Sequence, residues 1–589
     1  MAGGWAVLLM MLAGTVAAQQ VPVREETLDN GLRMLMVVRK ESPSVAAGWV
    51  ARVGSVNERP GITGIAHLFE HMMFKGTRTI GTKDAARCAE IRALQDGVRA
   101  LMDVEYQVLR QRLRRGEISG NIYDPENMTP RLRELKAELE ELYAAEKEII
   151  VKDELDQIYT EAGASGLNAF TSNDQTAYFI TVPANKLELW FWLESDRLLN
   201  PVFREFYSER DVVREERRLR VESTPVQKFE EMVDAMFWQS VPYAHPVIGW
   251  PSDVESITRE QAETFFETYY APNNITVVLA GDFDPDQALV LAQRYLGRIP
   301  RGPRPAPEVI TDEMPQLAER RFTAEADTNP EVRLRFPGVS FYHRDMFPLQ
   351  LLSDLLSRRT GRLYRELVEE KQVAVGQPYA LFRPMKYAGY FEVGAEVREG
   401  RRPEEVETAL WAELRRLADE AVDEKELQKV KNQAMANSFR RLESNFWLLL
   451  QLMIYDSMGD WRFINEAPAL LQQVTSQDIQ RVAREYLAPE KRNVITFLRK
   501  AGTEAADPEL AEMPAQMQAM VRQQLAQIAT VDDPAKLGEI LAQLQGALGQ
   551  VPPPMKPAVE YIIRKVNERM EALESAPASG DAAEEVDHV

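Results

Sequence analysis

A five-residue pattern sets the strongest limit on how this chain can fold. His67 and His71 lie four residues apart with Glu70 between them, in the order H-x-x-E-H. A helix places positions i and i+4 on the same face, so the pattern predicts a helix that brings two imidazoles to one metal ion. Two neutral nitrogen ligands suit zinc, and the carboxylate of Glu70 can take a proton from an attacking water molecule.

The same stretch also fits a buried amphipathic helix whose histidines are simply satisfied in the core. Apolar residues flank the pattern at Ile65, Leu68, Phe69, Met72 and Met73. For one isolated histidine that interpretation would be the better one. The complete pattern, with glycines on both sides, favours the metal site.

Length and composition limit the class of protein. A chain of 589 residues is too long for one hydrophobic core, so several domains are expected. The 45% hydrophobic and 27% charged residues are typical of a globular protein, and no apolar run after the first twenty residues is long enough to span a bilayer. The net charge of −21 argues against a nucleic acid as partner.

The first residues resemble a secretory signal peptide. An apolar run over residues 5–13 is followed by the small residues Val16, Ala17 and Ala18, so we expect residues 1–18 to be removed and the protein to be exported to a bacterial periplasm. No Lys or Arg precedes Arg24, so the amino terminus alone supplies the usual positive charge. The single Cys88 cannot form an internal disulfide.

Strands surround the metal-helix pattern, and a helical segment follows it. The Asn30-Gly31 turn precedes expected strands at 32–38 and 45–56, and two more are expected at 166–172 and 176–182. Residues 84–163 instead have helical spacing, in two arms at 85–115 and 130–161. This insert is most simply a solvated helical hairpin, with docking as its expected role.

A third zinc ligand is expected on the helix over residues 208–217, which Ser208 should cap. Glu209 and Glu216 are seven residues apart and share one face of that helix, whereas Glu215 points about 100° away. We therefore prefer Glu216 to Glu215. Without the H-x-x-E-H pattern, a glutamate here would be interpreted as a solvated surface charge.

Several motifs together resemble the pitrilysin/insulinase-type zinc metallopeptidases, the inverzincin family that includes the mitochondrial processing peptidases and shorter bacterial relatives. The matching stretches are residues 64–77, 168–172, 209–216, 243–249 and 270–274, and the resemblance covers about residues 21–500. It implies that His67, His71 and Glu216 bind one zinc ion per chain and that Glu70 is the catalytic base. It also implies that Glu209 supports the ligands from behind.

The resemblance implies an α+β fold of two homologous α/β-roll halves, rich in antiparallel sheet, that form a clam-like chamber. The stretch at 270–279 is echoed at 487–498. The expected units are a zinc-binding half at 21–300, a proline-rich linker at 301–317, a second half without ligands at 318–500, a helical extension at 501–575 and a disordered acidic tail at 576–589. His588 in that tail is interpreted as incidental.

The second half departs from the family at two positions. Complete single-chain members carry an arginine and, seven residues later, a tyrosine that help to bind substrate and stabilise the intermediate. The corresponding positions here are Val368 and Val375, and the nearby Arg365 and Tyr379 are out of register. This implies a heterodimer in which a related subunit supplies the Arg/Tyr pair, with a homodimer as the less favoured arrangement.

The sequence therefore predicts a zinc endopeptidase that acts on extended peptides or unfolded segments. Substrate would pair with the strand that holds Asn168, Ala169, Phe170 and Thr171. The alternative is a non-catalytic family member that serves as a scaffold or adaptor in a periplasmic assembly. The intact ligand set and Glu70 argue against it, because a structural zinc site has no use for a base.

Overall fold

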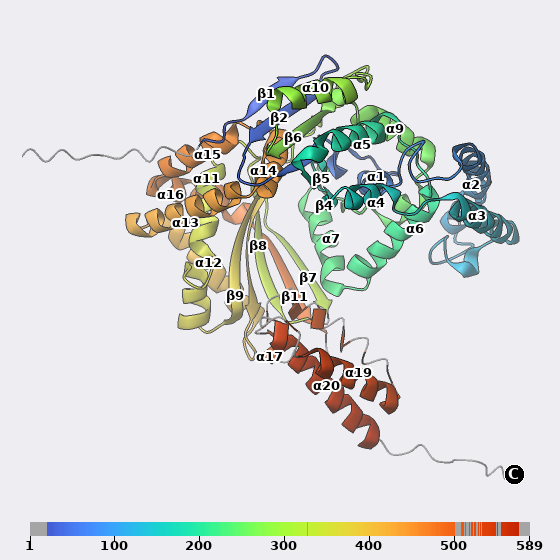
Figure 1. The fold of residues 1–589 in the computed structure, drawn as a ribbon. Helices are drawn as coiled ribbons and strands as arrows, with labels where there is room; N and C mark the ends of the chain where they lie inside the picture. Colours follow the sequence, from blue (N-terminus) through green and yellow to red (C-terminus); the bar gives the residue numbers. More distant parts are fainter. Residues whose placement is uncertain are drawn as a thin grey trace, which may run out of the picture.

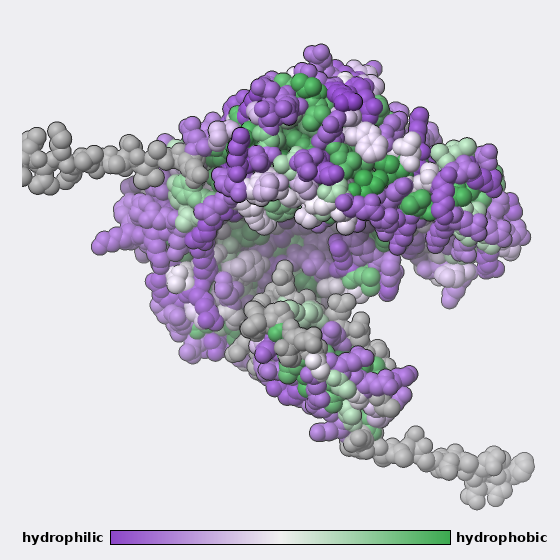
Figure 2. Space-filling model, in the orientation of Figure 1, coloured by the Kyte–Doolittle hydropathy of each residue, from purple (hydrophilic) through white to green (hydrophobic). Residues whose placement is uncertain are grey.

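The computed structural model describes residues 20–326, 328–500 and, with gaps, 508–575. The expected signal peptide and acidic tail, with His588, lie outside these residues. Figure 1 shows two sheets, each covered by helices, with a separate helical insert and a helical C-terminal extension. Figure 2 shows that the surface is hollowed between the two halves.

The first sheet has six strands in the order β1-β2-β6-β3-β5-β4. Strands β2 and β6 run parallel, and the other neighbours run antiparallel. The turn after β1 uses Gly31, whose φ of 89° suits glycine. The bounds are β1 Arg24–Thr27, β2 Arg33–Val38, β3 Ser44–Ala51, β4 Ser165–Thr171, β5 Thr176–Pro183 and β6 Ile275–Gly281.

The second sheet repeats this topology with five strands in the order β7-β11-β8-β10-β9. Strands β7 and β11 run parallel, as β2 and β6 do, and the two echoed sequence stretches supply β6 and β11 in equivalent places. The bounds are β7 Arg320–Ala326, β8 Glu331–Gly338, β9 Ala374–Pro384, β10 Gly389–Val397 and β11 Asn493–Arg499. The α+β fold class of two homologous halves is confirmed.

Helix α1 packs its apolar side on the first sheet. Tyr178 of β5 donates to the carbonyl of Phe69 in α1 at 3.4 Å and stacks on Trp49 of β3 at 4.2 Å between ring centroids. The Phe69 ring also lies 4.7 Å from that of Tyr270. The helices of this half are α1 Ile65–Met72, α5 Leu187–Leu199, α6 Phe206–Arg217, α7 Pro225–Phe237, α8 Pro251–Ser256, α9 Arg259–Tyr269 and α10 Pro285–Tyr295. Because its apolar residues are buried, α1 presents its histidines on the opposite side.

The insert forms the expected hairpin with one difference. Helix α2 spans Ala85–Arg114, but the second arm is broken into α3 Pro130–Ile149 and α4 Glu154–Glu161. The break occurs because Ile150 pairs with Thr82 as an isolated bridge and Asp153 adopts a left-handed φ of 55°. The prediction of one continuous helix over 130–161 was therefore wrong at this point.

The second half and the extension complete the helices. They are α11 Met346–Leu356, α12 Pro403–Asp419, α13 Glu424–Glu443, α14 Asn445–Met458, α15 Phe463–Gln473, α16 Ser476–Tyr486, α17 Pro508–Ala511, α19 Pro534–Ala547 and α20 Lys556–Ser575. Short helical turns are η1 Ser55–Asn57, η2 Pro125–Asn127, η3 Ala184–Lys186, η4 Arg218–Glu222, η5 Pro272–Asn274, η6 Tyr364–Glu370 and η7 Pro489–Lys491. Within the helical extension expected over 501–575, residues 508–528 are described only in pieces.

The two halves exchange helices. Helix α14 of the second half packs on the first sheet, where Leu449 and Met453 join one apolar cluster with Leu35 and Val278. Helix α7 of the first half packs on the second sheet, where the Phe229 ring lies 3.9 Å from that of Phe497. Each half therefore completes the other's core.

Ion pairs in which one side chain is buried accompany the exchanged helices. Asp456 of α14 forms an ion pair with Arg33 of β2 at 2.8 Å and accepts a hydrogen bond at 2.6 Å from Arg52, which directly follows β3. In the reciprocal position, Asp234 of α7 lies 2.6 Å from Arg335 of the second sheet. Removing one partner of such a pair leaves a buried charge uncompensated, so these contacts specify how the halves join.

Candidate metal centre

The N-terminus of α1 is fixed by a side chain from outside the helix. The Glu58 carboxylate accepts from the backbone N–H groups of Gly64 and Ala66, at 2.8 Å each. Gly64 has a φ of 90°, and a Cβ on it would lie 2.6 Å from the carbonyl oxygen of Ile248. Glycine is therefore required at position 64, because the loop over residues 243–249 packs directly against the start of α1.

Two buried arginines hold the chain beyond the other end of α1. Arg197 Nε donates to the carbonyl of Met73 at 2.9 Å, and Arg204 donates to the carbonyls of Lys75 and Ile80. Cations near a helix C-terminus satisfy its free carbonyls and interact favourably with its dipole. Both ends of the histidine helix are thus held by specific contacts.

Helix α6 begins at Phe206, two residues before the expected start. Ser208 does not cap it, because its hydroxyl donates to the carbonyl of Glu205 from inside the first turn. The capping position belongs to Glu205, which has a left-handed φ of 52°. The register of the helix is unaffected, and Glu209 and Glu216 still face α1.

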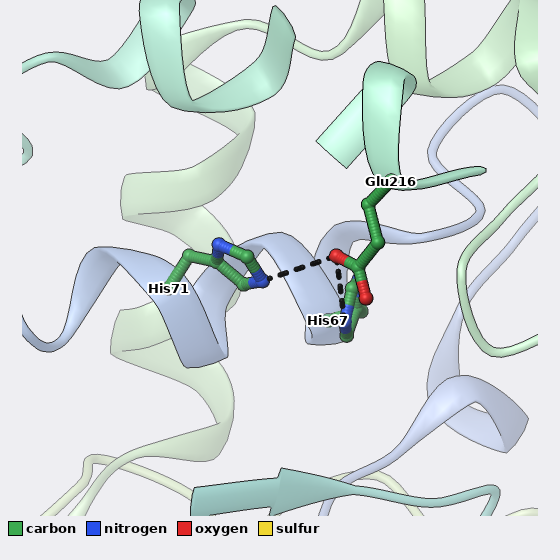
Figure 3. A group of neighbouring side chains, drawn as sticks. All are labelled: His67, His71 and Glu216. Carbon is green, nitrogen blue, oxygen red and sulfur yellow. Dashed lines mark ion pairs between the residues drawn. The ribbon is translucent and has the colours of Figure 1, made fainter. Parts of the chain in front are cut away.

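His67, His71 and Glu216 come together between α1 and α6, as Figure 3 shows. Glu216 Oε2 lies 3.5 Å from His71 Nε2 and 3.8 Å from His67 Nε2. One potential ligand atom from each residue lies within 4.8 Å of the others, and no second group of this kind is found among the described residues.

This donor set fits zinc. Tetrahedral ligands at normal Zn–N and Zn–O bond lengths are about 3.4 Å apart, close to the two distances to Glu216. Three protein donors also leave a position for water or substrate, as catalytic zinc sites do. His67 Nδ1 is buried and has no hydrogen-bond partner among the described residues.

Glu209 lies behind His71. Its Oε2 is 3.5 Å from His71 Nδ1, while its Oε1 accepts from Lys75 Nζ at 2.5 Å, and Lys75 also pairs with Glu205. Carboxylates placed behind a histidine fix its orientation and raise its basicity toward a metal. The sequence identified Glu209 but not the lysine that holds it.

The two histidines differ in their electrostatic surroundings. Burial, together with the neighbouring His71, lowers the pKa of His67 to about 4. Burial also lowers the pKa of His71, but hydrogen bonds and charges from Glu209 and Glu216 outweigh this effect and raise it to about 9. The hydrogen bond from His71 lowers the pKa of Glu216, which is therefore a carboxylate at neutral pH.

Glu70 lies on the same helix but has a different partner. Its Oε2 accepts from the hydroxyl of Thr171 at 2.6 Å, and burial raises its pKa against the effect of that hydrogen bond. Thr171 belongs to β4, the edge strand of the first sheet, so the expected substrate strand adjoins Glu70. The edge of β4 that faces away from β5 pairs with no other strand among the described residues. The expected substrate strand, β4, also includes Asn168, Ala169 and Phe170.

The neighbouring acid Glu215 points away from this group. It is exposed and forms a two-point ion pair with Arg218, whereas the second oxygen of Glu216 is held by Arg220 at 2.6 Å. Of the two acids, it is Glu216 that lies with His67 and His71. Arg220 and Glu58 were not identified from the sequence. Arg220 lies four residues after Glu216, a helical spacing that could have indicated the ion pair, whereas Glu58 precedes the helix and has no such spacing.

Two family models match this chain. Residues 33–118 and 150–250 match the model described as "Insulinase (Peptidase family M16)", and residues 256–434 match "Peptidase M16 inactive domain". The chain belongs to the M16 (pitrilysin/insulinase) peptidase family. The unmatched gap within the first model falls inside the helical insert.

M16 relatives with curated names agree with this assignment. The chain is 25% identical over 506 residues to "Zinc protease PqqE" of Helicobacter pylori, covering 84% of this chain and 97% of the relative. It is 26% identical over 484 residues to "Uncharacterized zinc protease ML0855" of Mycobacterium leprae, covering 80% and 91%. These names support an M16 peptidase-like function.

Solved M16 structures share the fold. A protease from Helicobacter pylori superposes with a TM-score of 0.65 at 22% identity, covering 81% of this chain and 99% of that one. The periplasmic protease PqqL from Escherichia coli gives 0.60 at 17%, covering 83% of this chain and 49% of that one. This M16 chain thus corresponds to about half of PqqL.

The second half of this M16 chain has valines where the resemblance implies Arg and Tyr. Val368, in η6, packs against the second core, and Val375 lies at the start of β9. Tyr379 is half-buried and donates to Glu392 at 2.9 Å, so its hydroxyl is already engaged within its own sheet. In the helices of the described residues, no segment is long and apolar enough to cross a membrane.

Proposed function

We propose that this M16 chain is a zinc-dependent endopeptidase, with His67, His71 and Glu216 as metal ligands and Glu70 as catalytic base. The observation that carries the proposal is the meeting of these three donors on α1 and α6, with Glu70 beside them on α1. A zinc ion held there would polarise a scissile carbonyl and lower the pKa of water. The inactive-scaffold alternative predicts no function for Glu70.

The residues of the chain then have separable tasks. Glu70 accepts a proton from the attacking water and passes it to the leaving amine, and its raised pKa suits that exchange. Glu209 orients His71, and Lys75 holds Glu209 in turn. An extended peptide would pair with the free edge of β4 by main-chain hydrogen bonds, which give affinity with little sequence preference.

We further propose that full activity needs a related subunit that supplies an Arg/Tyr pair. The apolar side chains of Val368 and Val375 cannot donate hydrogen bonds to a developing oxyanion. In this arrangement, residues 21–300 form the zinc-binding half and residues 318–500 the supporting half. The protein would be exported, as PqqL is described as periplasmic.

The test compares the wild-type chain with Glu70→Gln for zinc content and for cleavage of a quenched, unstructured peptide. Loss of general-base catalysis should lower cleavage by about 10²–10⁴-fold while zinc content stays at one per chain. The exposed Glu215→Gln is the matched control and should behave as wild type. Equal activity of Glu70→Gln and wild type, with zinc bound, would refute the mechanism.

The partner requirement is tested with the same assay. The chain alone should cleave slowly, and addition of a related subunit that carries the Arg/Tyr pair should raise the rate. A purified chain that is fully active as a monomer would contradict the requirement without affecting the roles of Glu70 and the ligands.

A further inference from the structure

Helix α2 of the insert exposes an apolar stripe. Among the described residues, five exposed large apolar side chains lie on this single helix: Leu94, Leu101, Val104, Val108 and Leu113. Four of them form one line, with exposed fractions of 53%, 51%, 57% and 45% for Leu94, Leu101, Val104 and Val108. Single exposed apolar residues are normal, but a line of them on one helix marks an interaction surface.

The stripe has the spacing of a coiled-coil seam. Leu94, Leu101 and Val108 are seven residues apart, and a second row with the same spacing is offset by three: Gly97, Val104 and Gln111. These are a and d positions of a heptad repeat. No charged residue occupies either row between residues 94 and 111.

The other face of α2 already has a partner. Val98, Met102, Tyr106 and Leu109 are buried in a small core with residues of α3, including Leu132, Leu135 and Leu139. The hairpin therefore does not need the stripe for its own packing. Figure 1 shows α2 and α3 at the edge of the molecule, away from the second half.

We propose that two copies of this chain associate through α2 of each, with the helices antiparallel. Aligning a positions with d positions places Leu101 opposite the second copy's Val104 and Gly97 opposite its Val108. The stripe begins at Leu94 and ends at Gln111, and its one residue without a side chain, Gly97, faces Val108 of the second copy in this register. In the antiparallel register each glycine receives the partner helix's valine, whereas a parallel register would place Gly97 opposite Gly97 and leave a gap in the seam.

The charges that close the stripe favour the same orientation. Glu90 and Arg115 continue the two rows at either end, with side chains that are 64% and 68% exposed. Each also has an exposed ion pair within its own chain, Glu90 with Arg87 at 2.9 Å and Arg115 with Glu117 at 3.6 Å. The antiparallel register places Glu90 opposite Arg115 at both ends, whereas a parallel register would bring like charges together. Glu105, at the flank, already accepts from the hydroxyl of Thr129 at 2.6 Å.

The pairing should be reversible. A single helix pair with a stripe of this length buries on the order of 1,000 Å², near the lower limit for a specific interface. A dissociation constant of about 1–100 μM is expected for such a contact. The dimer proposal does not depend on the proposed peptidase function, so a result that contradicts one of them leaves the other unaffected.

The first experiment measures mass by light scattering during size-exclusion chromatography of the full chain at several concentrations. The wild-type mass should rise above that of the 67.0 kDa chain toward the dimer as concentration increases. Leu101→Asp should remain monomeric, because it places two carboxylates at the centre of the pair. Val290→Asp, at an exposed position on α10, is the matched control and should dimerise as wild type.

The second experiment tests the register. In a Cys88→Ser background, the double variant Leu101→Cys/Val104→Cys should form disulfide-linked dimers under mild oxidation, and Leu101→Cys alone should form few. Efficient linkage of the single variant would overturn the antiparallel register. A wild-type chain that is monomeric at about 100 μM, or a dimer that survives Leu101→Asp, would overturn the interface itself.

Discussion

The two halves share a topology but differ at one helix, and that difference separates scaffold from chemistry. Helix α1 follows β3 in the first half, and α11 follows β8 at the equivalent place in the second. Of the two, α1 carries His67, Glu70 and His71, whereas the buried residues of α11 are mostly leucines. The same strand order thus tolerates either a polar site or a plain core, so fold alone does not assign function.

The largest effect should come from removing Glu216, the proposed ligand that joins α6 to α1. Glu216→Gln should lose metal by more than the 10–100-fold typical of a residue behind a ligand, because a direct donor is removed. Glu215→Gln should retain wild-type zinc, since that side chain pairs with Arg218. Zinc content after dialysis is the measurement. The reverse result would move the third ligand by one position.

The exchanged helices predict that the halves unfold together despite their different chemistry. Phe229→Ala removes the ring that α7 inserts against Phe322 and Phe497, and it should cost about 3–5 kcal/mol. Met453→Ala, on the reciprocal helix α14, should cost about 2–5 kcal/mol. Scanning calorimetry should show one main transition for residues 20–500. Two separate transitions, with only one moved by Phe229→Ala, would contradict the coupling.

Local patterns predicted the elements of both halves better than they predicted the contacts between them. Four-residue spacing identified the helix of His67 and His71, and seven-residue spacing selected Glu216, because both depend only on helix geometry. The exchange of α7 and α14 depends on which sheet face an apolar helix meets, and periodicity does not carry that information. The role of Glu58 is local in sequence but equally invisible to periodicity, because its contacts with the N–H groups of Gly64 and Ala66 depend on how the loop before α1 folds.

A smaller effect on metal binding should follow from Glu209→Gln. The amide can still contact His71 but cannot stabilise its charge, and metal affinity should weaken by about 10–100-fold. Glu205→Gln is the matched control, because Glu205 pairs with Lys75 and not with His71. Competition with a chelator of known affinity measures both. Equal loss in the two variants would mean that Lys75, rather than the contact to His71, is what matters.

The smallest effect concerns the carboxylates at the starts of the two equivalent helices, which should respond to pH in opposite ways. Burial raises the pKa of Glu58 above 4.5 despite its bonds to backbone N–H groups, so stability should fall as pH rises through that raised value. Burial also acts on Asp345, but Arg481 and Tyr486 lower its pKa below 3.8, so its contribution is present above that pH and lost as pH falls.

Urea unfolding of the metal-free chain across pH separates the two carboxylates. Glu58→Gln should remove the loss of stability above pH 4.5, since the amide keeps an acceptor for a helix N–H without a buried charge. Asp345→Asn should instead cost about 1.5–3 kcal/mol at neutral pH, and the difference from wild type should vanish in acid, because the charged hydrogen bonds are lost there in both. The exposed Glu41→Gln is the control. If Glu58→Gln and Asp345→Asn change the pH dependence of the unfolding free energy in the same direction, the N-termini of α1 and α11 are electrostatically alike. The two halves would then differ only in the proposed metal ligands.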